Sequence, residues 1–152
     1  MFRKTLLTSV CLLTLMGAAS AEVVLNRGND TDPATLDHHR TSTVSEGNVL
    51  RDLYDGLTIQ TANGEAVPGV AKAWDISEDG LLYTFHLRDD AKWSNGDPVT
   101  AGDFSFAFYR LMDPKTAAGY ASMLFVIKNA EDVAGGKKPV DELGVEAVDD
   151  HT

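Results

Sequence analysis

The 152-residue sequence has one cysteine, Cys11, and no apolar run long enough to span a membrane. The nearest to one, Leu6–Met16, has about half of the ~20 residues that a membrane-spanning helix needs. It follows Arg3 and Lys4 and precedes small residues up to Ala21, which is the pattern of a secretory signal peptide. We expect cleavage after Ala21 and a soluble exported protein. Because Cys11 is removed, that protein has no disulfide.

Basic residues are scarce in this chain. It carries 13 lysines and arginines against 23 aspartates and glutamates. Loss of residues 1–21 removes two of the basic residues and none of the acidic ones, which leaves a formal charge of −12 on the exported part. Nucleic-acid binding needs a basic surface, and so does adhesion to an anionic membrane. We therefore expect no nucleic-acid partner and no membrane insertion after signal cleavage.

Motifs for nucleotides and for nucleophilic catalysis are absent. The sequence has no G-x-G-x-x-G or P-loop pattern, and no G-x-S-x-G surrounds a serine. Ser42 or Ser45 lies near His39 and Asp37 in sequence, but nearness alone does not make a catalytic triad. The acidic pairs Asp89-Asp90 and Asp149-Asp150 are typical of solvated turns. The chain is not expected to be an enzyme.

His38 and His39 are the candidates for a metal. Neighbouring residues on an extended chain point in opposite directions, so the two cannot easily reach one ion. His86 and His151 offer no recognisable ligand spacing to this pair. We expect no metal and no cofactor; a secreted hydrolase or metalloprotein that uses these histidines and Asp37 stays as an alternative.

Hydrophobic periodicity predicts a mixed α/β fold (α+β) without internal repeats. In its first half we expect a buried strand at 22–26, a loop at 27–37, a helix capped by Ser45 and stopped at Asp55-Gly56, turns at Asn63-Gly64 and Asp79-Gly80, and a half-buried strand at 82–88. In its second half we expect a turn at 95–98, a helix opened by the capping box of Thr100 and Asp103 and ended at Asp113-Pro114, a weaker helix at 127–134, and the start of a strand at 143–152.

The aromatic residues divide into two groups. Most of those at strand or helix spacing are expected in the core: Tyr83, Phe85, Phe104, Phe106, Phe108 and Tyr109. Tyr120 follows a glycine outside any apolar stripe, and pattern alone leaves it as either a core residue or a ligand contact.

Four stretches of the chain together resemble the periplasmic oligopeptide-binding proteins, the solute-binding family 5 components of ABC importers. They are residues 36–57, 67–104, 113–122 and 136–152, in the order of that family. The resemblance implies a clamshell of the type II (cluster C) periplasmic-binding-protein class with an additional domain. It divides the chain into a signal peptide (1–21), the first segment of the ligand-docking lobe (22–55) and the additional antiparallel-sheet-plus-helix domain (56–152), truncated at its C-terminal end.

The resemblance also implies a function: capture of oligopeptides in the periplasm by main-chain strand pairing, and delivery to ABC permease subunits by a monomeric binding protein. It places the ligand-binding residues at Ser42, Thr43, Val44 and Tyr120. The same fold with another solute, such as a dipeptide, murein peptide, nickel complex or haem, is an alternative. A proline at Thr43 should impair docking because it removes an N–H from this segment.

Members of the family are several times longer than this chain, so we expect an incomplete N-terminal fragment. The groups that bind the charged ends of the peptide would come from the part beyond Thr152. Residues 22–152 alone are therefore expected to bind peptides weakly or not at all.

Overall fold

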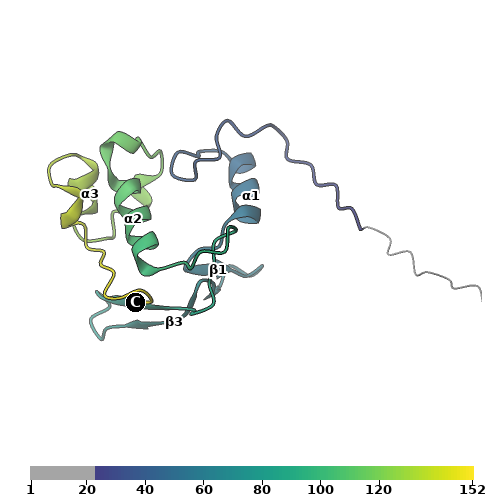
Figure 1. Cartoon of the computed structure of the whole chain (residues 1–152). Coiled ribbons are helices and arrows are strands. Elements are labelled where there is room, and N and C mark those ends of the chain that lie inside the picture. The colour runs from purple at the N-terminus through teal and green to yellow at the C-terminus, as the bar shows by residue number, and fades with distance from the viewer. Residues whose placement is uncertain (1–22) are drawn as a thin grey trace, which may run out of the picture.

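The structure is a computed structural model that describes residues 23–152, so the expected signal peptide lies outside the described residues. Along these residues, one α-helix is followed by two β-hairpins and then by two further α-helices (Figure 1). Their bounds are α1 Val44–Leu53, β1 Thr58–Gln60, β2 Ala66–Pro68, β3 Ala71–Ile76, β4 Tyr83–Leu87, α2 Ala101–Met112 and α3 Ala130–Ala134. The expectation of a mixed α/β chain is confirmed.

Both hairpins are antiparallel, and each turns at a dipeptide that the sequence indicates. β1 pairs with β2 around Asn63-Gly64, and β3 pairs with β4 around Asp79-Gly80. Gly64 has φ +86° and Gly80 has φ +70°, a left-handed conformation that glycine adopts at little cost. The predicted turns and the predicted strand at 82–88 are therefore confirmed.

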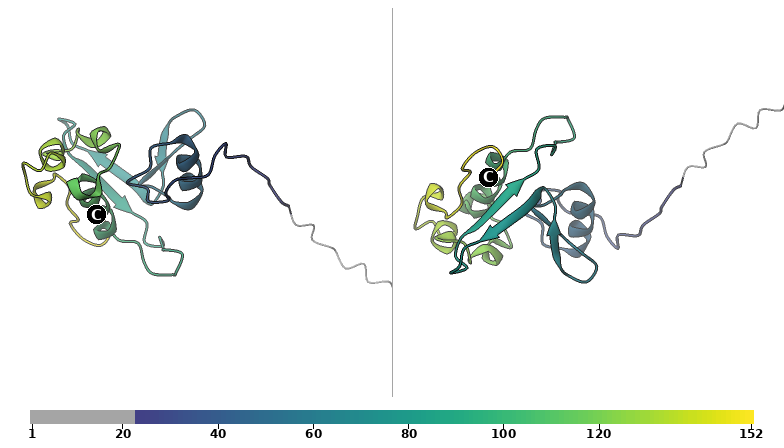
Figure 2. Two further views of the ribbon diagram at one scale, coloured as in Figure 1. Left: turned by 90° about the horizontal axis from the view of Figure 1, so that it is seen from above. Right: turned by 90° about the horizontal axis from the view of Figure 1, so that it is seen from below.

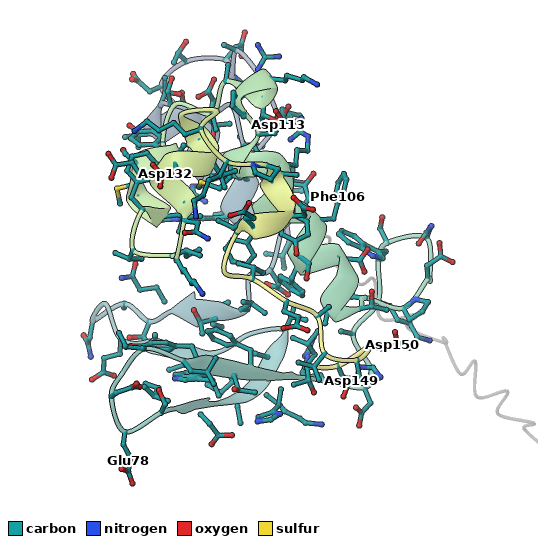
Figure 3. All side chains as sticks on the ribbon, turned by 90° about the vertical axis from the view of Figure 1, so that its left-hand side faces the viewer. Glu78, Phe106, Asp113, Asp132, Asp149 and Asp150 are labelled. Atoms are coloured by element: carbon teal, nitrogen blue, oxygen red, sulfur yellow. The ribbon has the colours of Figure 1, made fainter. Side chains whose placement is uncertain are left out.

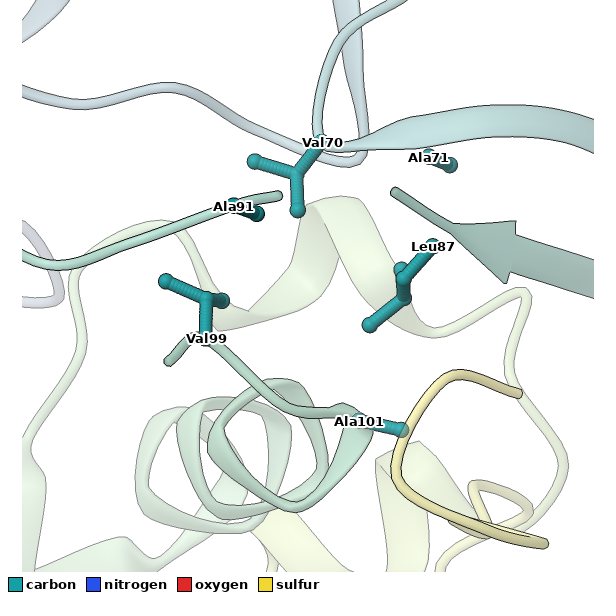
Figure 4. Packing of buried hydrophobic residues seen from close by; sticks show 6 residues of the cluster. All are labelled: Val70, Ala71, Leu87, Ala91, Val99 and Ala101. Carbon is teal, nitrogen blue, oxygen red and sulfur yellow. The ribbon is translucent and has the colours of Figure 1, made fainter. Parts of the chain in front are cut away.

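The first of two small cores packs the β3–β4 hairpin against the start of α2 (Figure 4). Its largest buried side chain is Leu87, which is 2% exposed. Short residues complete this core: Val70, Ala71, Ala91, Val99 and Ala101, with Phe85 and Phe104 packed at its side. Alternation along β4 puts Phe85 and Leu87 on this face, as the sequence predicts.

The second core lies between the last turns of α2, α3 and the segment that follows them. Met112, Val133 and Leu143 are almost fully buried there, and Phe108 and Leu111 from α2 pack against them. Figures 1 and 2 show α2 and α3 over the same side of the β3–β4 hairpin, and α2 contributes residues to both cores. α1 stands apart, beside β1, and contributes to neither core.

Helix ends are set by local hydrogen bonds. Thr100 and Asp103 form the capping box that the sequence predicts for α2. At α1 the cap is Thr43, one residue before the helix, and not Ser45 as predicted. The reason is that Glu46 stands three residues after Thr43 and completes a capping box with it.

Two predicted strands are wrong. Val23–Leu25 lie in no strand and are 65–95% exposed, because no strand of residues 23–152 runs beside them to pair with. The segment 143–152 is also not a strand: near its end the His151 carbonyl accepts from the Leu87 N–H at 2.8 Å and the Asp150 carbonyl accepts from the Ala101 N–H at 2.9 Å, but no ladder of paired residues forms. The Asp149 carboxylate accepts from the His151 N–H at 2.8 Å, which turns the chain there.

The prediction that most stripe aromatics are core is wrong for Phe106, which is 66% exposed, and for Tyr83, which is 53% exposed. Figure 3 shows Phe106 projecting outwards from α2. Phe106 lies two residues from Phe104 and from Phe108, so it points to the other side of the helix. In residues 23–152 no helix has both the length and the apolar character to cross a membrane.

Candidate functional site

The segment 41–44 is extended at Thr43 and enters α1 at Val44, and a buried carboxylate holds it in place. Glu46 is 2% exposed, and its Oε2 accepts hydrogen bonds from the N–H groups of Ser42 at 2.8 Å and Thr43 at 2.9 Å. In return, the Thr43 Oγ1 accepts from the Glu46 N–H at 3.3 Å. The two backbone N–H groups lower the pKa of Glu46, so the carboxylate stays charged and the cap stays formed at neutral pH.

A cleft of about 330 Å³ opens between this segment and α1. One face of α1 forms its wall, since the lining residues Val44, Gly47, Asn48 and Arg51 recur at helical spacing. The other lining residues are Thr41, Ser42, Thr43 and Tyr120. All four candidate ligand-binding residues therefore line one cleft: Ser42, Thr43, Val44 and Tyr120.

Tyr120 comes from a distant part of the chain. It precedes a short 3-10 helix at Ala121–Leu124, after α2, and its hydroxyl donates to the Ser42 carbonyl at 3.3 Å across 78 positions of sequence. The ring is 58% exposed and is not a core residue. Of the two alternatives that the pattern leaves open for Tyr120, the core one is wrong.

The backbone N–H groups that remain available in this segment differ from those expected. The N–H groups of Ser42 and Thr43 already donate to Glu46, so the prediction that the Thr43 N–H is available for docking is wrong. Val44 is the first residue of α1, and its N–H has no acceptor within the helix. Residues 23–152 supply no other acceptor for it, and the Val44 side chain is 81% exposed. Among residues 42–44, Val44 is therefore the one whose N–H has no acceptor within residues 23–152.

A polar cluster beneath the cleft ties the loop before α1 to α2. Arg110 Nη1 donates to Asp37 Oδ1 at 2.8 Å, and Arg110 Nη2 donates to Asp37 Oδ2 at 2.6 Å. The His39 Nδ1 lies 2.8 Å from Arg110 Nη1 and must accept, because arginine has only donors. His39 is therefore neutral with its proton on Nε2. Figure 1 shows this loop reaching toward α2.

The cluster already uses groups that a catalytic site would need. Burial, together with the nearby His38 and Arg110, lowers the pKa of His39 to about 4. The hydrogen bonds from Arg110 hold the pKa of Asp37 far below its usual range. Both Asp37 oxygens and the His39 Nδ1 are thus engaged with Arg110 and do not activate Ser42 or Ser45. Within the described part of the chain, no three His, Cys, Asp or Glu residues are grouped so as to hold a metal ion.

Sequence reasoning missed Arg110, Arg51 and Asn48. Arg110 lies at a polar position near the end of an amphipathic helix, and nothing in the local pattern links it to Asp37. For Arg51 and Asn48 a signal was present, because they stand seven and four residues after Val44 and so share its face of the helix.

Comparisons with known proteins show which family the chain belongs to. Residues 65–152 match the family described as "Bacterial extracellular solute-binding proteins, family 5 Middle". The periplasmic oligopeptide-binding protein OppA of Haemophilus influenzae is 50% identical over 132 residues, which are 86% of this chain and 24% of that protein. The periplasmic murein peptide-binding protein MppA of Escherichia coli is 48% identical over 123 residues, 80% of this chain and 23% of that protein.

A solved structure shares the fold. The crystal structure of Haemophilus influenzae OppA in complex with RPPGFSPFR superposes with a TM-score of 0.78 at 51% identity, over 81% of this chain and 24% of that one. The chain thus spans about a quarter of the length of the curated relatives it matches. More than half of it matches the family, and the architecture agrees with that of a solved relative. The chain belongs to family 5 of the bacterial extracellular solute-binding proteins.

Proposed function

We propose that this chain is the N-terminal portion of a periplasmic oligopeptide-binding protein that delivers peptides to an ABC importer. The observation that carries the proposal is the cleft lined by Ser42, Thr43, Val44 and Tyr120. It brings together an extended segment and an exposed aromatic ring from 78 positions further along the chain. The similarity to oligopeptide-binding relatives at about half identity supports the same function.

The extended segment has the donor and acceptor that an added strand requires. The Ser42 carbonyl and the Val44 N–H lie two residues apart, and Thr43 between them is extended, with φ −118° and ψ 158°. Groups at this spacing point to the same side of an extended chain. The Ser42 oxygen has a second lone pair besides the one that the Tyr120 hydroxyl uses. Main-chain pairing of this kind binds peptides of varied sequence.

We assign residues 22–55 to the ligand-docking lobe and residues 56–152 to the additional domain. Both buried cores are made by residues from Val70 onward, which supports a boundary after α1. The polar cluster of Asp37, His39 and Arg110 joins the two parts. We further propose export by the signal peptide with cleavage after Ala21, and action as a non-enzymatic monomer that hands its ligand to permease subunits.

Calorimetric titration with tri- to pentapeptides tests the function. The protein expressed from its complete gene should bind several peptides of unrelated sequence with a Kd on the order of micromolar or tighter, equivalent to about −8 kcal/mol. The same peptides with one N-methylated main-chain amide are the control, and they should bind more weakly. A folded protein that binds none of these peptides would overturn the proposal.

A murein peptide is the second candidate ligand, since the murein peptide-binding relative is 48% identical to this chain. A murein tripeptide added to the same titration separates the two. Tight binding of this one ligand, with no binding of ordinary peptides, would favour the second candidate.

A further inference from the structure

We propose that Arg51 gives the cleft its ligand specificity by binding a carboxylate of the bound molecule. This inference rests on the proposed peptide-binding function and names a preference within it. The carboxylate is either an acidic side chain or the free C-terminus of the ligand, and both present the same planar group to the guanidinium.

The position of Arg51 suits such a contact. It stands two helical turns after Val44 on the face of α1 that lines the cleft. Seven residues of helix rise about 10 Å, which is the length of about three residues of extended peptide. If a peptide pairs with Val44 and then runs parallel to α1, its residue about three positions beyond the paired one reaches Arg51.

The charges around the cleft favour an acidic group. Arg51 is the one charged residue among the eight that line the cleft, although acidic residues outnumber basic ones in this chain. Glu46 lies nearby, but its carboxylate is buried and occupied by the Ser42 and Thr43 N–H groups. The ligand-facing wall thus offers a cation and no carboxylate side chain to repel an anion.

Arg51 has no side-chain partner within residues 23–152, and Arg40, which does not line the cleft, is alike in this. The three other arginines of that range are paired. Arg27 pairs with Asp52, Arg88 with Asp90, and Arg110 with Asp37. No ion pair and no side-chain hydrogen bond involves Arg51 in the described part of the structure. Its five donors are therefore available to a ligand, and a guanidinium binds a carboxylate through two parallel hydrogen bonds.

The test is a set of matched peptides titrated into the protein expressed from its complete gene. Pentapeptides that differ only by Glu or Gln at one position report on an acidic side chain. The same neutral pentapeptide as free acid or C-terminal amide reports on the terminal carboxylate. Variants Arg51→Gln and Arg51→Lys probe the site, and Arg27→Gln is the control because Arg27 lies outside the cleft.

In one of the two comparisons, we expect the parent to bind the carboxylate form about tenfold more tightly than the neutral form. A tenfold change in Kd is the size of effect that a hydrogen bond to a charged group produces. Arg51→Gln should reduce that ratio to about one by weakening binding of the carboxylate form. Arg51→Lys should retain part of the ratio, and Arg27→Gln should keep it whole. If Arg51→Gln loses the preference for Glu over Gln, the carboxylate is an acidic side chain. If it loses the preference for free acid over amide, the carboxylate is the C-terminus of the peptide.

Two results would overturn the inference and leave the proposed function standing. In the first, the parent binds neutral and acidic peptides equally well. In the second, the preference survives in Arg51→Gln. If the parent binds no peptide at all, the proposed function itself fails. Circular dichroism of each variant shows that it is folded.

Discussion

Arg110 binds Asp37 through two hydrogen bonds of 2.8 and 2.6 Å, across 73 positions of the sequence. The pair fixes the loop before α1 against the last turns of α2. It therefore holds the cleft segment 41–44 beside the part of the chain that carries Tyr120. Asp37 is 26% and Arg110 35% exposed in their side chains, so the pair is half-buried and is screened less than a surface ion pair.

The first prediction concerns this pair. Arg110→Met removes both guanidinium donors to the Asp37 carboxylate, which keeps only the His39 N–H at 3.2 Å, and it removes the donor to His39 Nδ1. It should lower the Tm by several degrees. Arg88→Met is the control, since its pair with Asp90 is long, at 3.7 Å, and exposed. Thermal unfolding followed by circular dichroism checks this prediction, and equal Tm values for the two variants would contradict it.

The second prediction is a dependence of stability on pH. The pKa of His39 is about 4 in the folded chain, against an ordinary 6.5, because the imidazole is buried beside Arg110 and His38. Between these values the unfolded chain binds a proton that the folded one does not. The His39 contribution is thus complete above about pH 6.5 and falls as the pH drops to 4, by up to about 3 kcal/mol.

Denaturant unfolding of His39→Gln between pH 4 and 7.5 measures that contribution. The glutamine oxygen can still accept from Arg110 but does not titrate, so the slope should flatten in this window. His38 has a lowered pKa as well and adds to the slope in the same direction, so His38→Gln should flatten it in part. His86→Gln, at a partly exposed imidazole beside Asp75 and outside this cluster, is the comparison variant. An unchanged slope in His39→Gln contradicts the assignment.

The third prediction concerns the cap of α1. Thr43→Ala removes the side-chain acceptor of the Glu46 N–H and should cost about 1 kcal/mol of unfolding free energy. Thr43→Ser keeps that oxygen and should cost much less. Equal losses in the two variants, measured by urea unfolding, would show that the capping hydrogen bond does not stabilise the helix.

The fourth prediction compares two large residues of α2. Met112 is 1% exposed in the second core, and Met112→Ala should cost about 2–5 kcal/mol. Phe106 on the same helix is 66% exposed, so Phe106→Ala should cost far less. Urea unfolding of both variants ranks the two positions. A larger loss at Phe106 would mean that its face of α2 is covered in solution.

Sequence alone predicts the features that depend on a few neighbouring residues. The turns at Gly64 and Gly80 and the cap at Thr100 each follow from local chemistry, and the structure has them as predicted. The strand expected at 22–26 fails because a strand depends on a distant partner that the short sequence pattern does not show.

In the candidate site, too, the local features could be predicted from the sequence and the long-range contacts could not. The nearness of Ser42 and Tyr120 came from the resemblance to a family, since no spacing in the sequence implies it. The role of Arg110 could not be predicted, because its partners Asp37 and His39 belong to a different element. The Glu46 carboxylate was overlooked, although Thr43-x-x-Glu46 is a capping-box pattern, and it decides which N–H groups remain available.

The central claim is that peptides dock on the main chain of residues 42–44, and Val44→Pro tests it most directly. Proline is favoured at the first position of a helix, and Thr43 before it is extended, so the fold should accept the change. The substitution removes the one N–H of residues 42–44 that has no acceptor within residues 23–152. Val44→Ala is the matched control, because it shortens the side chain and keeps the N–H.

The measurement is the peptide Kd of both variants by calorimetry, in the protein expressed from its complete gene, with circular dichroism to confirm folding. Because an unpaired carbonyl would be left on the ligand, Val44→Pro should raise the Kd about tenfold or more, and Val44→Ala should change it much less. Equal Kd values for Val44→Pro and Val44→Ala, at parent affinity, would contradict docking on this segment.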